Sequence, residues 1–166
     1  TDKVLRLTGF DPNTAAEALI PKGMSRFYLD EPKNLQACNA GAGGVFTARS
    51  LAKIYAALAN WGELDGVRLL SAQTLREVVK VYNNQRGDVV PMPMNWRLGY
   101  HRVFTTWPRT PYAFGHFGYG GSGAWADPSR HLAVGYIVNT GSGSPFADLR
   151  LWRINTAVIE TVDKLG

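Results

Sequence analysis

The chain has 166 residues, of which 45% are apolar and 19% are charged, and its formal net charge is +5. This length and apolar content fit one domain with a buried core, and they exclude an intrinsically disordered chain. The basic residues form no block, so a solvated surface is favoured over nucleic-acid binding, and no apolar run approaches the roughly 20 residues that span a bilayer.

The N-terminal 46 residues predict little regular structure, because they are rich in Gly, Pro and Asn. Asp11-Pro12-Asn13 is typical of the opening of a short helix over residues 14–19. Residues 21–24 predict a turn, and residues 39–44 form a glycine-rich loop that leads into Thr47.

An amphipathic helix is predicted from the N-cap Thr47 to about Asn60. Its apolar residues recur at i, i+3, i+4 and i+7 and form one face: Leu51, Ile54, Tyr55 and Leu58. The pairs Trp61-Gly62 and Asp65-Gly66 then act as stop and turn signals, so we expect the helix to end here.

A second helix is predicted from its cap Ser71 to about Val81, and a polar loop covers residues 83–93. The pattern then changes to short β-rich segments: 98–104, 112–116, 123–127 and 132–139. The sequence Asp127-Pro128-Ser129-Arg130 has proline where a type I turn favours it, so the last two strands should form a hairpin.

A final amphipathic helix is predicted after the break at residues 141–145 and extends to about Lys164. Its apolar stripe comprises Leu151, Ile154, Val158 and Val162. The fold class is therefore α+β: an antiparallel sheet of about three to four strands, a C-terminal helix packed on it and an N-terminal helical region. We expect residues 1–95 to be the helical and irregular part, and residues 96–166 to hold the strands and the last helix.

The most informative stretch for function is Gly115-His116-Phe117-Gly118-Tyr119-Gly120-Gly121-Ser122-Gly123. Glycines at a strand end let a ligand or another backbone approach closely. His116 at such an edge, followed by exposed backbone N–H groups, suits an anionic or carbonyl group. The alternative, favoured from these residues alone, is a glycine-rich hairpin connection with a structurally satisfied histidine.

This stretch, with Ala126-Asp127-Pro128 and Val134 to Asn139, resembles the third motif region of the β-lactamase-related serine hydrolases. Residues 47–60 and 62–71 also resemble a stretch upstream of that motif, so the likeness covers roughly residues 40–165. It is most similar to the esterase and lipase branch, in which His replaces the Lys of the Lys-Thr-Gly triplet of β-lactamases.

The resemblance implies part of a β-lactamase or transpeptidase-like fold and an acyl-enzyme mechanism. In that family a Ser in Ser-x-x-Lys attacks a carbonyl, while the Lys and a Tyr in Tyr-x-Asn move protons. By the same resemblance His116 takes the polar position of the triplet, and the Tyr119 N–H is an oxyanion donor. The substrate-binding residues implied are Gly118, Gly120, Gly121 and Ser122.

Two short matches to the missing motifs are interpreted as chance patterns. Ser50-Leu51-Ala52-Lys53 lies within the stretch that resembles a non-catalytic family region. At about 100° per residue, Ser50 and Lys53 both point away from the apolar stripe and toward solvent. Tyr82-Asn83-Asn84 is the second match. We therefore expect the nucleophile and tyrosine motifs to lie upstream of this chain.

The chain is predicted to be the C-terminal portion of a serine esterase or lipase. By itself it is expected to have no catalytic activity. Its partners would be a small ester and the missing N-terminal portion, with self-association through an unpaired sheet edge. Two alternatives stay open: a β-lactamase or D-amino-acid peptidase, and a non-catalytic binding or oligomerisation module. His116 weighs against the first alternative, because those enzymes usually place a fixed cation there for the substrate carboxylate.

No cofactor or metal is expected. The single cysteine, Cys38, excludes an internal disulfide and cysteine-based zinc sites, and the three histidines lack ligand spacing. Trp125 is interpreted as a residue that packs the sheet. The chain begins at Thr1 without an initiator Met or signal segment, so we expect a processed chain or a piece of a longer one. The compartment stays open, with the cytoplasm favoured.

Overall fold

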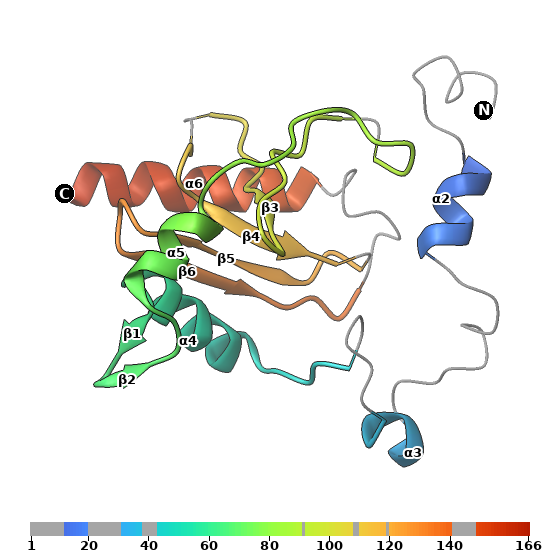
Figure 1. Cartoon of the computed structure of the whole chain (residues 1–166), viewed down its shortest axis with the longest axis horizontal. Helices are drawn as coiled ribbons and strands as arrows, with labels where there is room; N and C mark the ends of the chain where they lie inside the picture. Colours follow the sequence, from blue (N-terminus) through green and yellow to red (C-terminus); the bar gives the residue numbers. More distant parts are fainter. Residues whose placement is uncertain are drawn as a thin grey trace. The chain divides into compact units, whose positions relative to one another are not determined.

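The computed structural model describes residues 12–19, 31–37, 43–90, 92–107, 110–118, 120–140 and 149–166 (Figure 1). The chain divides into two compact units. The first comprises Thr1–Phe46 with Gln85–Pro93, and the second comprises Thr47–Asn84 with Met94–Gly166. The predicted membership of this chain in one larger catalytic domain stays a prediction.

Among its described residues, the first unit holds two short helices, α2 (Pro12–Leu19) and α3 (Pro32–Leu35). Helix α2 confirms the short helix expected here, although it begins at Pro12 rather than at residue 14. Proline is well suited to the first turn of a helix, since its missing N–H would have no partner there. The predicted turn at 21–24 and most of the glycine-rich loop at 39–44 lie outside the described residues.

The second unit has the predicted α+β class. Its elements in chain order are α4 (Ala48–Ala59), β1 (Glu63–Leu64), β2 (Val67–Arg68), α5 (Ala72–Val78), β3 (His101–Arg102), β4 (Phe114–Phe117), β5 (Gly123–Asp127), β6 (Leu132–Tyr136) and α6 (Leu149–Leu165). Strands β3, β4, β5 and β6 form an antiparallel sheet in that order, while β1 and β2 form a separate hairpin.

The sheet separates two apolar clusters. Phe114 and Ala126 face Leu58 of α4 and Leu75 of α5. On the other face Trp125 and other side chains pack against α6 through Leu151 and Ile159. Figure 1 shows α6 along one side of the sheet and α4 along the other. The alternation of side chains along β4 and β5 produces these two faces, because neighbouring residues of a strand point in opposite directions.

Helix α4 begins as predicted at Thr47, which forms a reciprocal capping box with Ser50. Its predicted apolar face is partly wrong, because Ile54 is 39% exposed. The helix contacts β6 where the strand has no side chain. A Cβ at Gly135 would overlap with the carbonyl oxygen of Ala48 and the backbone of Ala52. Ala52 thus faces β6, and Ile54 lies about 200° around the helix from Ala52, on the exposed side.

The turn signals after α4 have a clear backbone basis. Asp65 and Gly66 have φ of 51° and 77° and connect β1 to β2. Two consecutive residues with positive φ are the requirement of a type I′ hairpin turn, for which Asp-Gly is a preferred pair. The predicted turn is confirmed, whereas the short strands on each side of it were not expected.

The predicted strands are present but shorter, and the second helix also ends early. The segment 98–104 forms only β3, since Gly99 has φ of 79° and the Arg102 N–H donates to the carbonyl of Met94. Strand β6 ends at Tyr136 because its partner β5 begins at Gly123. Helix α5 ends at Val78 instead of about Val81.

Helix α6 confirms the predicted C-terminal helix, but the residues on its buried face differ from the predicted ones. Leu151, Asn155 and Ile159 are buried, whereas Ile154, Val158 and Val162 are only half-buried. The polar Asn155 is tolerated there because its side chain is hydrogen-bonded. It accepts from Trp125 Nε1 at 2.9 Å and donates to the carbonyl of Phe104 at 3.0 Å.

Candidate functional site

His116 lies near the end of β4 on the sheet face toward α4 and α5. It is paired with Ala124 of β5 and follows Phe114 on the same face. The residue is exposed, although its neighbours Gly115 and Phe117 are buried. Within the described part of the chain its imidazole makes no hydrogen bond and contacts the ring of His101. His116 is therefore available to a ligand.

The charge of His116 follows from its surroundings. Nearby protein atoms displace part of the water around its imidazole, and this desolvation lowers its pKa below the usual value. A lowered pKa favours the neutral ring at neutral pH. His116 can thus donate or accept a hydrogen bond there, but it does not provide a fixed positive charge.

A second histidine, His101 of β3, lies beside His116, with 5.2 Å between the ring centroids. His101 is 3% exposed. Its Nδ1 is 2.8 Å from the carbonyl oxygen of Arg102, and its Nε2 accepts the N–H of Phe117 at 3.3 Å. Because Nε2 is the acceptor, the proton of the neutral ring is on Nδ1 and is donated to Arg102. Desolvation lowers the pKa of His101 to about 4.

The contact of His101 with His116 was not expected from the sequence. The available signal was its place in a predicted strand that could pair with the strand of His116. Neither its spacing nor its neighbours in the sequence indicated this contact, since the two histidines are joined only by the sheet register.

The glycines after His116 form a tight turn. The Gly121 N–H donates to the carbonyl of Gly118 at 2.9 Å, and the Gly118 N–H donates to the carbonyl of Ser122 at 2.8 Å. Gly121 has φ of 94°, as expected for the left-handed position of such a turn. The backbone of Gly118 is thus committed to the turn. Gly120 is exposed, and Tyr119 lies outside the described residues, so their roles stay predictions.

Ser122 has a structural contact that the sequence did not indicate. Its Oγ accepts the N–H of Val138 at 3.0 Å. This contact replaces a strand partner just beyond the end of β6. The hydroxyl hydrogen of Ser122 remains able to donate, so the predicted substrate contact stays a prediction.

The two short motif matches have ordinary structural roles. Ser50 Oγ accepts from the Thr47 N–H and donates to the Thr47 carbonyl, each at 3.0 Å. Lys53 Nζ is 3.1 Å from an Asp65 carboxylate oxygen, and its side chain is 68% exposed. The prediction that Ser50 and Lys53 face solvent is confirmed. Tyr82 is 55% exposed and donates to Glu77.

Trp125 is fully buried and donates to Asn155, which confirms its predicted packing role. None of the predicted site residues that the structure describes lines a cleft of about 400 Å³. It is lined by Asn95, Arg97, Arg102, Val103, Thr105, Thr106, Trp107, Thr110 and Pro111. Among the described residues no group of three or more His, Cys, Asp or Glu side chains could hold a metal ion. No helix described by the structure has the length and apolar character to cross a membrane.

Comparisons with known proteins agree on one family. The sequence model described as "Beta-lactamase" matches residues 4–158. The curated "Esterase/beta-lactamase LipL" of Mycobacterium tuberculosis (strain ATCC 25618 / H37Rv) is 42% identical over 105 residues. That match covers 59% of this chain and 23% of the relative.

Two solved structures are also similar. The first is a penicillin-binding protein homolog from Caulobacter crescentus, with a TM-score of 0.61 and 32% identity, covering 69% of this chain and 31% of that protein. The second, a family VIII carboxylesterase, has a TM-score of 0.56 and 35% identity, covering 63% of this chain and 29% of its own length. The chain thus spans about a quarter to a third of these proteins.

Proposed function

The chain belongs to the beta-lactamase family, and from this membership we propose that it is the C-terminal portion of a serine esterase. Relatives named as an esterase and a carboxylesterase support a hydrolase of this kind. The proposed reaction is hydrolysis of a small ester through an acyl-enzyme. A serine Oγ attacks the ester carbonyl and expels the alcohol, and water then releases the acid.

The observation that carries the proposal is the exposed, predominantly neutral imidazole of His116 at the end of β4. A neutral ring suits an uncharged ester, since it can donate a hydrogen bond without requiring a substrate carboxylate. A β-lactamase or D-amino-acid peptidase of the same family would favour a fixed cation at this position. His116 therefore supports the esterase over that alternative.

In the proposed arrangement the ester carbonyl lies against the edge formed by His116 and the turn that follows it. The backbone N–H of Tyr119 and that of the nucleophile stabilise the oxyanion of the tetrahedral intermediate. Gly118 provides room for the substrate because it has no side chain. The nucleophile and its proton-transfer partners belong to the part of the protein upstream of this chain, so the 166 residues by themselves are inactive.

Hydrolysis of p-nitrophenyl esters tests this proposal on two proteins: the 166-residue chain, and a longer chain that includes the upstream Ser-x-x-Lys segment. We expect turnover only from the longer chain. Ser50→Ala should leave its kcat unchanged, like the matched control Ser71→Ala, which removes the cap of α5. The short chain itself could hydrolyse the ester and lose this activity in Ser50→Ala but keep it in Ser71→Ala. That result would overturn the proposal that the nucleophile lies upstream. A longer chain without turnover would refute the esterase.

The non-catalytic alternative has one specific observation in its favour. The sheet ends at β6, whose outer edge has no strand partner among the described residues. Such an edge can recruit another chain. Within the proposed esterase this edge would instead meet the remaining part of the same protein. A gene that encodes no Ser-x-x-Lys segment at the start of an apolar helix would favour the binding module.

A further inference from the structure

We propose that His101 is a positioning residue for the wall of the site that contains His116. The inference rests on the proposed function, because it assigns His101 a task within that active site. His101 holds the end of β4 by accepting the N–H of Phe117 and keeps the ring of His116 oriented through direct contact.

The sheet register explains why a side chain is needed at this point. His101 pairs with Gly115 and Arg102 pairs with Phe114. Continuing this antiparallel register would place Gly99 opposite Phe117, but β3 begins only at His101 and Gly99 has φ of 79°. The N–H of Phe117 therefore has no strand partner. The Nε2 of His101 replaces the missing carbonyl at 3.3 Å.

His101 can serve as a fixed acceptor because its ring is held from several directions. Its Nδ1–H donates to the Arg102 carbonyl at 2.8 Å. The ring also contacts Trp96 and Phe104, each at 5.7 Å between centroids, and the residue is 3% exposed. Rotation of the ring would break the hydrogen bonds of both nitrogens within a buried pocket, which is costly.

The same ring acts directly on His116. The two imidazoles meet edge to face, with 5.2 Å between centroids and 65° between planes. A positive charge on His101 would be opposed by Arg97 and, whenever it is protonated, by His116, the two groups that act on it electrostatically. A neutral His101 therefore keeps the Phe117 N–H paired and avoids repelling a proton on His116. Both effects act on the strand end just before the proposed oxyanion donor.

The first experiment uses the unmodified 166-residue chain. Nitrogen-15 NMR of the histidine rings should find His101 neutral at pH 7, with its proton on Nδ1 and with Nε2 as the acceptor. Amide exchange at Phe117 should be slow. A His101 proton on Nε2, or fast exchange at Phe117, would overturn the proposal without reference to catalysis.

The second experiment compares two substitutions of similar size. His101→Phe keeps a ring but removes the acceptor, whereas His101→Gln keeps an acceptor near the position of Nε2. We expect at least tenfold faster exchange of the Phe117 amide and a shifted titration of His116 in His101→Phe, with partial recovery in His101→Gln. The exposed His131→Asn, whose new residue tolerates the φ of 49°, is the control and should change neither.

The last measurement tests whether His101 affects ester hydrolysis in the longer chain, which is expected to be active. His101→Phe should lower kcat for p-nitrophenyl esters at least tenfold with a smaller change in KM. The kcat of His101→Gln should lie between the values of His101→Phe and the unmodified chain. An unchanged kcat would refute the positioning role of His101 in the reaction. If the unmodified longer chain shows no turnover while the NMR results hold, the proposed esterase fails and the structural role of His101 stands.

Discussion

At the scale of single residues, the environment of each histidine decides what it can do. His101 is buried with both ring nitrogens hydrogen-bonded, whereas the neighbouring His116 is exposed. Burial that is compensated by two hydrogen bonds stabilises one tautomer of a neutral ring. An exposed ring beside it remains free to meet a ligand. In the proposed site, His101 would therefore hold the strand end and His116 would contact the ligand.

The buried state of His101 makes stability depend on pH. Its pKa is about 4 in the folded chain and near 6.5 when unfolded, so the unfolded state binds a proton first as pH falls. The stabilisation is complete above pH 6.5 and is lost progressively down to pH 4. At about 1.4 kcal/mol per pKa unit, the loss reaches about 3 kcal/mol.

Urea unfolding of the native chain and His101→Gln at a series of pH values checks this expectation. The difference in unfolding free energy between them should shrink by up to about 3 kcal/mol between pH 7.5 and pH 4. Taking the difference cancels the carboxylates common to both chains. A difference that is independent of pH would show that His101 does not titrate as a buried neutral ring.

At the scale of elements, contacts between helices and the sheet are set by small and polar residues as much as by large apolar ones. Helix α4 approaches β6 at Gly135, where a Cβ would overlap with the helix backbone. Helix α6 places Asn155 between Leu151 and Ile159. There the amide joins Trp125 of β5 to the backbone of Phe104. Both contacts restrict how each helix can lie on the sheet.

Asn155→Leu should destabilise the fold by at least about 2 kcal/mol, although it preserves the branched shape of the side chain. The substitution leaves the indole N–H of Trp125 and the carbonyl of Phe104 buried without partners, and each costs about 1–3 kcal/mol. Thermal and urea unfolding measure the loss. Thr161→Ala on the exposed side of α6 is the control and should change stability by less than about 1 kcal/mol. An Asn155→Leu chain as stable as the original would contradict this account.

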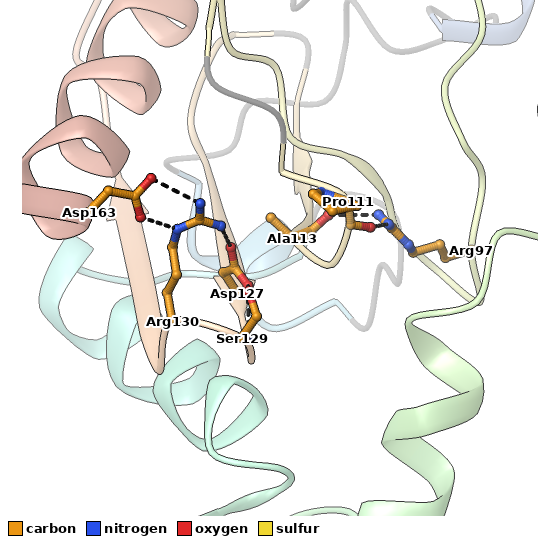
Figure 2. Close-up of polar contacts among 7 residues, drawn as sticks. All are labelled: Arg97, Pro111, Ala113, Asp127, Ser129, Arg130 and Asp163. Carbon is orange, nitrogen blue, oxygen red and sulfur yellow. Dashed lines mark hydrogen bonds and ion pairs between the residues drawn. The ribbon is translucent and has the colours of Figure 1, made fainter. Parts of the chain in front are cut away.

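At the scale of the compact unit formed by residues 47–84 and 94–166, two arginines connect segments that are distant in sequence (Figure 2). Arg97 donates to the carbonyls of Val79, Pro111 and Ala113 at 2.6–2.8 Å. Arg130 bridges the buried Asp127 of β5 to Asp163 of α6. One arginine thus joins the end of α5 to the segment before β4, and the other joins the β5–β6 turn to α6.

Arg97→Gln is expected to lower the unfolding free energy by about 2–4 kcal/mol. Arg97 is 6% exposed and its guanidinium satisfies three carbonyl oxygens, which the shorter amide cannot all reach. Burial lowers the pKa of Arg97, but the group remains charged at neutral pH. Chemical unfolding compares this variant with Arg153→Gln on the exposed face of α6. Equal losses in the two variants would refute the special role of Arg97.

Local sequence predicted the features that depend on neighbouring residues. The caps Thr47 and Ser71, the Asp65-Gly66 turn and the β5–β6 hairpin are all present. Each arises from hydrogen bonds or backbone angles within a few residues, which a local pattern records directly. The outward direction of Ser50 and Lys53 followed from helical periodicity in the same way.

What the tertiary structure decided depends on contacts between distant parts of the chain. The exposure of Ile54 follows from the contact between α4 and Gly135, and the pairing of His101 with Phe117 follows from the register of β3 against β4. His101 and Phe117, which this hydrogen bond joins, are 16 positions apart in the sequence. By itself the sequence determined the α+β class and most of the local elements, and it singled out His116 as a candidate site residue. Only the fold determined that His101 lies beside His116, because a strand register depends on two segments and cannot be read from either one alone.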